Sequence, residues 1–243
     1  MSDDAPPHED DAWRERVREA WDGRAASWDE TASANASAPD RAADLDRTID
    51  ALGLRPGDRV LDAGCGSGHW AIAFAERGLK VTALDLSPEL MRLAMAHAER
   101  RRVAVEWRLG DLARLDDPFA VYRAIHCRTA LQFVPDVPAA LHDFRRVLRP
   151  GGRLLASVPG ALSPIYRGSW RRHLRVEPPA VNWLAPWELE RLLGFAGWII
   201  REEWGEYGRD LTGEPNAFQP GALADLDRRL RQAAATTWTF IAS

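Results

Sequence analysis

Val60-Leu-Asp-Ala-Gly-Cys-Gly-Ser-Gly68 joins a short apolar run to three glycines in the spacing G-x-G-x-G. Glycine has no Cβ, so a backbone built from it can pass close to a ligand with its N–H groups pointing outward. The residues from Arg59 to Ala63 have the composition of a short β-strand, and a helical pattern follows from His69 to Arg77. A strand, a glycine turn and a helix in this order predict a nucleotide-type binding loop.

Strand-like and helix-like segments alternate along the rest of the chain. Further strands are predicted at 80–85, 103–109, 122–130, 153–158, 198–204 and 238–242, and further helices at 88–100, 138–148, 187–196 and 222–234. Strands separated by helix-length segments specify βαβ units with right-handed crossovers. The predicted fold class is therefore α/β, with a doubly wound, seven-stranded and mostly parallel sheet.

The length of 243 residues and a hydrophobic content of 46% are expected for one domain with a sizeable core. Residues 1–11 are acidic and contain proline, which predicts a disordered tail. The single domain is expected over 12–243, beginning with helices over 12–52 that a loop at 33–39 interrupts. Residues 159–186 lack a clear period and are interpreted as an excursion on the substrate side of the sheet.

Charge and cysteine content narrow the function classes. Lys and Arg total 32 against 36 Asp and Glu, a net charge of -4, so a nucleic-acid partner is disfavoured. Cys65 and Cys127 show no paired spacing, which indicates neither a disulfide framework nor a metal site. No apolar run approaches the roughly 18 residues that a membrane span needs, so we expect a cytoplasmic protein without a membrane partner. A homodimer is left open.

A carboxylate stands in register with the glycine loop. Asp85 ends the second predicted strand about twenty residues after the glycines, where an acid can accept hydrogen bonds from both hydroxyls of a ribose. The dinucleotide fingerprint requires a third glycine three residues after the second, and His69 occupies that position. A nicotinamide-dependent oxidoreductase therefore remains an alternative with an imperfect loop.

Nearly the whole chain resembles the class I S-adenosylmethionine-dependent methyltransferases of the small-molecule type, which have a Rossmann-like fold. The resemblance rests on the glycine segment with Asp62 before it, on Asp85, on Gly110-Asp-Leu112 and on the turn Leu148-Arg-Pro-Gly-Gly152. It implies that the segment 238–242 is an antiparallel seventh strand. It also implies S-adenosylmethionine as cofactor, bound by Trp28, Asp62, Ala63, Gly64, Gly66, Asp85, Leu86, Met91, Gly110, Asp111, Leu112 and Cys127.

Methyl transfer from a sulfonium is an in-line displacement, for which alignment in a water-poor pocket supplies most of the rate. A general base is optional, and the candidates are His126 in the fourth predicted strand and His173 in the excursion. The arginines around His173 could hold an anionic substrate, although a solvated charged face is the favoured interpretation. Some of the eleven tryptophans could line an apolar acceptor pocket.

The segment after the fourth predicted strand bears on the acceptor. Cys127-Arg-Thr-Ala-Leu-Gln-Phe133 stands where enzymes of this family that methylate amino groups of nucleic acids or proteins carry Asn-Pro-Pro-Tyr. This departure favours a small-molecule acceptor. Three hypotheses stay open: a small-molecule methyltransferase, a nicotinamide-dependent oxidoreductase, and a non-catalytic module that binds S-adenosylmethionine.

Overall fold

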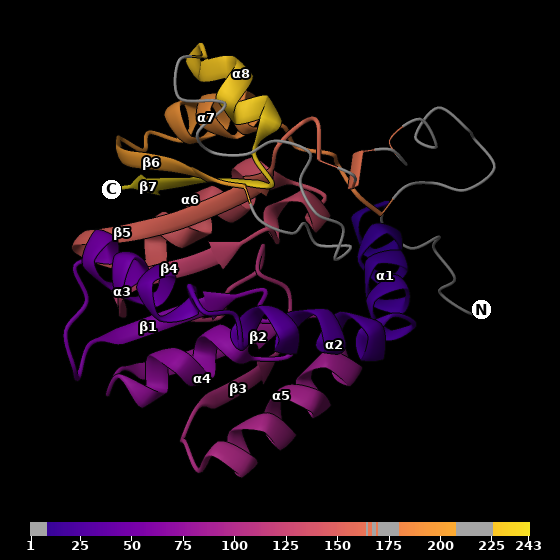
Figure 1. The fold of residues 1–243 in the computed structure, drawn as a ribbon, viewed down its shortest axis with the longest axis vertical. Helices are drawn as coiled ribbons and strands as arrows, with labels where there is room; N and C mark the ends of the chain where they lie inside the picture. Colours follow the sequence, from indigo (N-terminus) through magenta and orange to yellow (C-terminus); the bar gives the residue numbers. More distant parts are fainter. Residues whose placement is uncertain (1–8, 164, 167–168, 170–179, 208–225) are drawn as a thin grey trace, which may run out of the picture.

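Seven strands form one sheet in the computed structural model, which describes residues 9–163, 165, 166, 169, 180–207 and 226–243 (Figure 1). The strands are β1 (Arg59–Ala63), β2 (Lys80–Asp85), β3 (Glu106–Leu109), β4 (Tyr122–Arg128), β5 (Leu148–Pro159), β6 (Ile200–Glu206) and β7 (Thr237–Ala242). Their order is β3-β2-β1-β4-β5-β7-β6, and β7 alone runs opposite to the other six strands. The predicted doubly wound, mostly parallel sheet is confirmed.

Helices cover both faces of the sheet. They are α1 (Glu9–Asp22), α2 (Ala25–Ala36), α3 (Arg41–Leu52), α4 (His69–Glu76), α5 (Pro88–Arg101), α6 (Val137–Val147), α7 (Pro186–Phe195) and α8 (Arg228–Ala234), with a 3-10 turn η1 (Leu131–Phe133). Helices α3 and α4 supply one buried cluster and helices α6 and α7 the other. Within β4, Ile125 belongs to the cluster of α6 and α7 and Ala124 to that of α3 and α4, as the two-residue period of a strand requires.

Local sequence signals account for the helix starts. Ser87 caps α5, because its Oγ accepts a hydrogen bond from the backbone N–H of Leu90 at 3.1 Å, and Pro88 occupies the first turn. Asp136 caps α6 in the same way through the N–H of Ala139 at 2.9 Å. These caps fix where each helix leaves the carboxyl end of a strand.

Several boundaries differ from the predictions, among them the start of β5 at Leu148 instead of 153, and three others have a local explanation. Residues 9–11, expected in the tail, form the first turn of α1, where acidic side chains favour the helix dipole. Helix α2 continues to Ala36 through part of the expected loop, and the hydroxyl of Ser37 bonds back to the carbonyl of Ser33. Strand β3 begins only at Glu106, because the N–H of Val103 still bonds to the carbonyl of Ala98 in α5.

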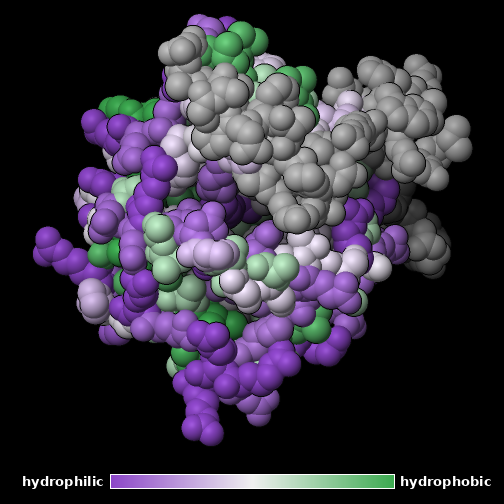
Figure 2. All heavy atoms as spheres, viewed as in Figure 1, coloured by the Kyte–Doolittle hydropathy of each residue, from purple (hydrophilic) through white to green (hydrophobic). Residues whose placement is uncertain are grey.

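The strand order reverses between β1 and β4. From β1 the chain builds outward through β2 and β3, and from β4 it builds in the opposite direction through β5. Such a switch point opens a crevice at the carboxyl ends of the strands, where ligands bind in open α/β sheets. Helix α1 stands beside this end of the sheet in Figure 1. The face in Figure 2 is mainly hydrophilic where it is coloured, with hydrophobic residues in small separate groups.

Candidate functional site

The glycine loop follows β1 at the switch point. Gly64, Gly66 and Gly68 have φ angles of 78°, 55° and 82°, which L side chains rarely adopt. A Cβ on Gly64 would lie 2.4 Å from the Cβ of Ala130, so space as well as conformation requires glycine there. The N–H groups of Gly64 and Cys65 both donate to the carbonyl of Leu84, at 2.8 and 3.0 Å. The loop is thereby fixed against the end of β2.

Asp85 ends β2 beside this loop. Its Oδ2 accepts a hydrogen bond from the N–H of Gly66 at 2.8 Å, and its Oδ1 accepts one from the N–H of Ser87 at 3.0 Å. Burial raises the pKa of the Asp85 carboxyl, although the two backbone donors oppose that shift. A carboxylate oxygen accepts more than one hydrogen bond, so lone pairs remain for ligand hydroxyls.

Asp111 follows β3 in the same layer. The N–H of Gly110 donates to the carbonyl of Asp85 at 2.9 Å and brings the end of β3 beside β2. Oδ1 of Asp111 accepts a hydrogen bond from the N–H of Ala113 at 2.8 Å, and Oδ2 accepts one from Nε of Arg14 in α1. This carboxylate therefore links the pocket edge to the N-terminal helix.

These elements enclose one pocket at the carboxyl end of the sheet, with about 690 Å³ of empty space that is partly open to solvent. Its lining is mainly apolar, with a few convergent polar groups, as in small-molecule sites generally. The lining residues are Val17, Trp21, Trp28, Gly64, Gly66, Leu84, Asp85, Leu86, Leu90, Gly110, Asp111, Leu112, Arg128, Thr129, Ala130, Phe133 and Val134.

An aromatic group closes one side of the pocket. The ring of Trp21 in α1 meets the rings of Trp28 in α2 and Phe133 in η1 edge to face, with centroids 5.3 and 5.1 Å apart. Nε1 of Trp13 also donates to the carbonyl of Phe133 at 2.9 Å. A Cβ on Gly66 would lie 3.0 Å from Nε1 of Trp28, so the indole lies directly on the glycine loop. The two N-terminal helices thus cover the pocket.

Eight of the twelve residues predicted to bind the cofactor line this pocket: Trp28, Gly64, Gly66, Asp85, Leu86, Gly110, Asp111 and Leu112. The other four, Asp62, Ala63, Met91 and Cys127, are outside the lining. Burial raises the pKa of the Cys127 thiol, whose side chain belongs to the core. Sδ of Met91 lies 3.8 Å from Sγ of Cys65, next to the loop.

The two histidines predicted to be catalytic have different outcomes. His126 is 1% exposed, and its Nδ1 lies 2.8 Å from Oδ1 of Asp62. Its ring packs against Trp70 and Phe74, with centroids 4.7 and 5.2 Å away, and it does not line the pocket. Its catalytic role stays a prediction, and His173 lies outside the described residues.

Sequence reasoning missed several lining residues. Arg128 ends β4 and Thr129 follows it with a φ of 55°, and both line the pocket. Arg128 also forms an ion pair with Glu206 of β6 and lies 5.1 Å from the ring centroid of Trp70. Ligands bind where the strand order reverses, so residues at the end of β4 are candidates once β4 is known to lie beside β1. The structure shows that pairing, and the sequence alone does not.

The arrangement fits an adenosyl group. Two carboxylates, one after β2 and one after β3, lie along the same pocket as a glycine loop in which a Cβ would collide with Ala130. Carboxylates at these positions suit ribose hydroxyls and an exocyclic amine, and the glycine backbone admits a close ligand. The fold and this site together resemble those expected of a class I S-adenosylmethionine-dependent methyltransferase domain.

Known proteins with this resemblance match part of the chain. Residues 60–152 match the family described as a methyltransferase domain. A malonyl-[acyl-carrier protein] O-methyltransferase of Serratia marcescens is 39% identical over 127 residues, which cover 50% of this chain and 48% of that protein. A ubiquinone biosynthesis O-methyltransferase of Alkalilimnicola ehrlichii is 37% identical over 117 residues, 47% of each chain. The chain spans about half the length of these curated relatives.

Among solved structures, the fold is similar to that of the geranyl diphosphate C-methyltransferase from Streptomyces coelicolor A3(2). The TM-score is 0.65 at 17% identity, over 98% of this chain and 99% of that chain. None of the helices in the described part of the chain combines the length and apolar character needed to cross a membrane.

Proposed function

We propose that this protein transfers a methyl group from S-adenosylmethionine to a small-molecule acceptor by in-line displacement. The observation that carries the proposal is the shared pocket of the glycine loop, Asp85 and Asp111. We assign the cofactor contacts to the eight predicted residues that line it. S-adenosylmethionine, when bound, supplies an electrophilic methyl group on a positively charged sulfur.

The residues of this chain would act chiefly by positioning and by excluding water. Trp21, Trp28 and Phe133 form an apolar wall from three separate elements, so this side of the pocket is shielded from solvent. In such a pocket, alignment of the reacting groups can supply most of the acceleration. The lining described above includes no histidine, which favours an acceptor that needs no general base from these residues.

The acceptor class follows from size and lining. A pocket with about 690 Å³ of empty space suits a cofactor and part of a small acceptor, and Arg128 and Thr129 are polar residues of its lining beside the two acids. Two relatives are named as O-methyltransferases, which supports testing carboxyl and hydroxyl acceptors first. Neither relative's own substrate is assigned to this chain.

We also propose a cytoplasmic location, no nucleic-acid partner, and a homodimer as the state to test. The net charge of -4 and two cysteines that form no disulfide support the first two points. Size-exclusion chromatography with light scattering decides between monomer and dimer, and a filter-binding assay with RNA and DNA tests the second point.

The decisive experiment is calorimetric titration with S-adenosylhomocysteine. We expect one site per chain, at least 10-fold weaker binding in Asp85→Ala because a carboxylate acceptor is lost, and unchanged binding in Asp116→Ala, an exposed acid near the same edge. Binding that Asp85→Ala leaves unchanged would contradict the proposal.

Two further measurements separate the alternatives. Quenching or enhancement of NADH fluorescence at micromolar protein would favour the oxidoreductase. Tight S-adenosylmethionine binding without release of S-adenosylhomocysteine, over a panel of carboxylic acids, phenols, amines and thiols, would favour the non-catalytic module.

A further inference from the structure

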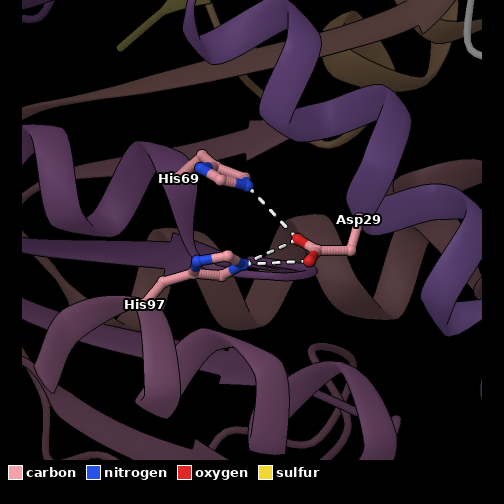
Figure 3. A group of neighbouring side chains, drawn as sticks. All are labelled: Asp29, His69 and His97. Atoms are coloured by element: carbon pink, nitrogen blue, oxygen red, sulfur yellow. Dashed lines mark hydrogen bonds and ion pairs between the residues drawn. The ribbon is translucent and has the colours of Figure 1, made fainter. Parts of the chain in front are cut away.

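Two imidazoles and a carboxylate converge outside the pocket. Figure 3 shows the rings of His69, at the start of α4, and His97, on α5, pointing toward the side chain of Asp29 on α2. Nε2 of His69 lies 3.3 Å from Oδ1 of Asp29, and Nε2 of His97 lies 2.8 and 3.0 Å from its two oxygens. One ligand atom from each residue lies within 4.8 Å of the others.

We propose that Asp29, His69 and His97 bind a divalent transition-metal ion, with zinc the best match. Imidazole nitrogen and carboxylate oxygen are zinc ligands, and bonds of about 2.0–2.1 Å in a tetrahedron separate neighbouring ligand atoms by about 3.3 Å. The three distances from histidine Nε2 to the oxygens of Asp29 equal that edge or fall short of it by a few tenths of an ångström, so small side-chain movements admit the ion. The fourth position is left to water.

A metal ion can reach the three ligands from solvent. The side chains of Asp29, His69 and His97 are 17%, 18% and 16% exposed, which leaves a route for the ion while keeping the ligands ordered by packing. The His rings lie 4.8 Å apart at a tilt of 43°, so neither covers the face of the other completely. The ligands come from three helices, which fixes their positions better than a surface loop would.

The hydrogen bonds of both histidines define what the ion must displace, and they include the 3.2 Å contact between Oγ of Ser33 and Nε2 of His69. Without an ion, Asp29 accepts a hydrogen bond from Nε2–H of each histidine, and Nη2 of Arg100 donates to Nδ1 of His97 at 2.6 Å. Coordination through Nε2 moves the proton of His97 to Nδ1, where a guanidinium is no longer a partner. Arg100 is exposed and can turn into solvent. Arginine at this position therefore weakens metal binding without preventing it.

The ion would fasten the cover of the pocket. Helix α2 carries Trp28, α4 begins directly after the glycine loop, and α5 begins three residues after Asp85. A bond from each helix to one ion would hold α2 against the core beside the cofactor site. The role is structural, and it lies beyond the methyl transfer proposed above.

The test begins with folded full-length protein that has been treated with EDTA and dialysed. We expect calorimetry with Zn²⁺ to give one site per chain, and Co²⁺ to produce the visible absorption bands of a four-coordinate ion. Zinc should also raise the melting temperature, since an ion that binds only the folded chain stabilises it. Absence of both zinc binding and cobalt bands would overturn the proposal.

Variants place the ion on these three side chains. His69→Ala, His97→Ala and Asp29→Asn should each weaken zinc binding by at least about 100-fold, the upper range for loss of a supporting residue. His142→Ala, which removes an exposed histidine of α6, should leave it unchanged. Circular dichroism and S-adenosylhomocysteine binding show that each variant is folded. Zinc binding that survives the first two substitutions would contradict the site.

A second pair of variants tests the role of Arg100. Arg100→Gln should bind zinc more tightly than the parent protein, because the amide oxygen of glutamine accepts a hydrogen bond from Nδ1–H of His97. Arg92→Gln changes another exposed arginine of α5 and should have no effect. Weaker binding in Arg100→Gln would contradict coordination through Nε2 of His97.

Discussion

Nε of Arg14 in α1 donates a hydrogen bond to Oδ2 of Asp111, the acid that follows β3, although 97 residues separate the two. Their side chains are 14% and 15% exposed, so solvent screens this ion pair only partly. Asp111 consequently holds the N-terminal helix across the edge of the pocket. A ligand amine at this edge must share the carboxylate with Arg14.

Removal of that ion pair should loosen the cover of the pocket. We expect Arg14→Ala to weaken S-adenosylhomocysteine binding about 3- to 10-fold, mainly through faster dissociation, because α1 contributes Val17 and Trp21 to the lining. Stopped-flow tryptophan fluorescence measures the dissociation rate. Arg18→Ala, whose partner Glu15 is exposed, is the matched control. Tighter binding in Arg14→Ala would instead show that Arg14 competes with the ligand for Asp111.

A comparison of two glycines distinguishes the cost of a left-handed backbone from the cost of a steric clash. Gly64 and Gly151 have φ angles of 78° and 74°, but a Cβ at Gly64 meets Ala130 at 2.4 Å and one at Gly151 meets nothing within 4 Å. Gly151→Ala should lower the free energy of unfolding by about 1–2 kcal/mol, the cost of a left-handed alanine. Gly64→Ala should lower it further by at least another ~1 kcal/mol. Urea unfolding measures both, and equal values would refute the crowding argument.

Tyr122 predicts a pH-dependent contribution to stability. Its hydroxyl donates to Oδ1 of Asp117 at 2.7 Å, and Tyr122→Phe should lower the free energy of unfolding by about 1–3 kcal/mol near pH 8. Burial raises the pKa of Tyr122 to about 12, from an ordinary value of 10. Between these values the unfolded phenol ionises while the folded one stays neutral, so stability falls as the pH rises.

Tyr122→Phe should therefore lower the free energy of unfolding by less at alkaline pH than at neutral pH. The difference in unfolding free energy between the parent protein and Tyr122→Phe should narrow from pH 10 toward pH 12 and stay constant between pH 7 and 9. Denaturant unfolding at fixed ionic strength measures it. A difference that widens above pH 10 would have the wrong sign for a buried neutral phenol.

His126→Ala distinguishes a buried structural histidine from a catalytic one. We expect the free energy of unfolding to fall by about 3 kcal/mol, because Asp62 loses its 2.8 Å partner within the core. His142→Ala at the surface should change it by less than about 0.5 kcal/mol. Affinity for S-adenosylhomocysteine should survive. A turnover loss above 100-fold without loss of stability would support the catalytic prediction instead.

The sequence predicted what local patterns encode. Glycine spacing, the cap at Ser87 and the alternation of apolar residues in β4 each depend on only a few neighbouring residues. The strands, the helices and the position of Asp85 beside the glycine loop could therefore be predicted. Asp111 after β3 was likewise predictable, since parallel strands place their carboxyl ends at one edge.

Contacts between residues far apart in the chain could not be predicted from the sequence. Arg14 reaches Asp111, and Asp29 reaches His69 and His97, only after helices from distant parts of the chain pack together. The residues of the histidine pair are 28 positions apart, far from the i, i+4 spacing of a short helical metal motif. The strand period predicted that side chains of β4 alternate, but it could not tell that the face of His126 lies against Trp70 and Phe74.

Strand β7 lies between β5 and β6, although it follows both in the chain. On the ribosome, β6 emerges with no partner in the sheet, and its backbone groups stay unpaired until Thr237–Ala242 has been made and inserted. All six residues of β7 are buried, so this late insertion completes the layer that supports both helical faces. The native sheet can therefore be completed only after Ala242, the last residue of β7, has been made, even if the glycine loop has formed much earlier.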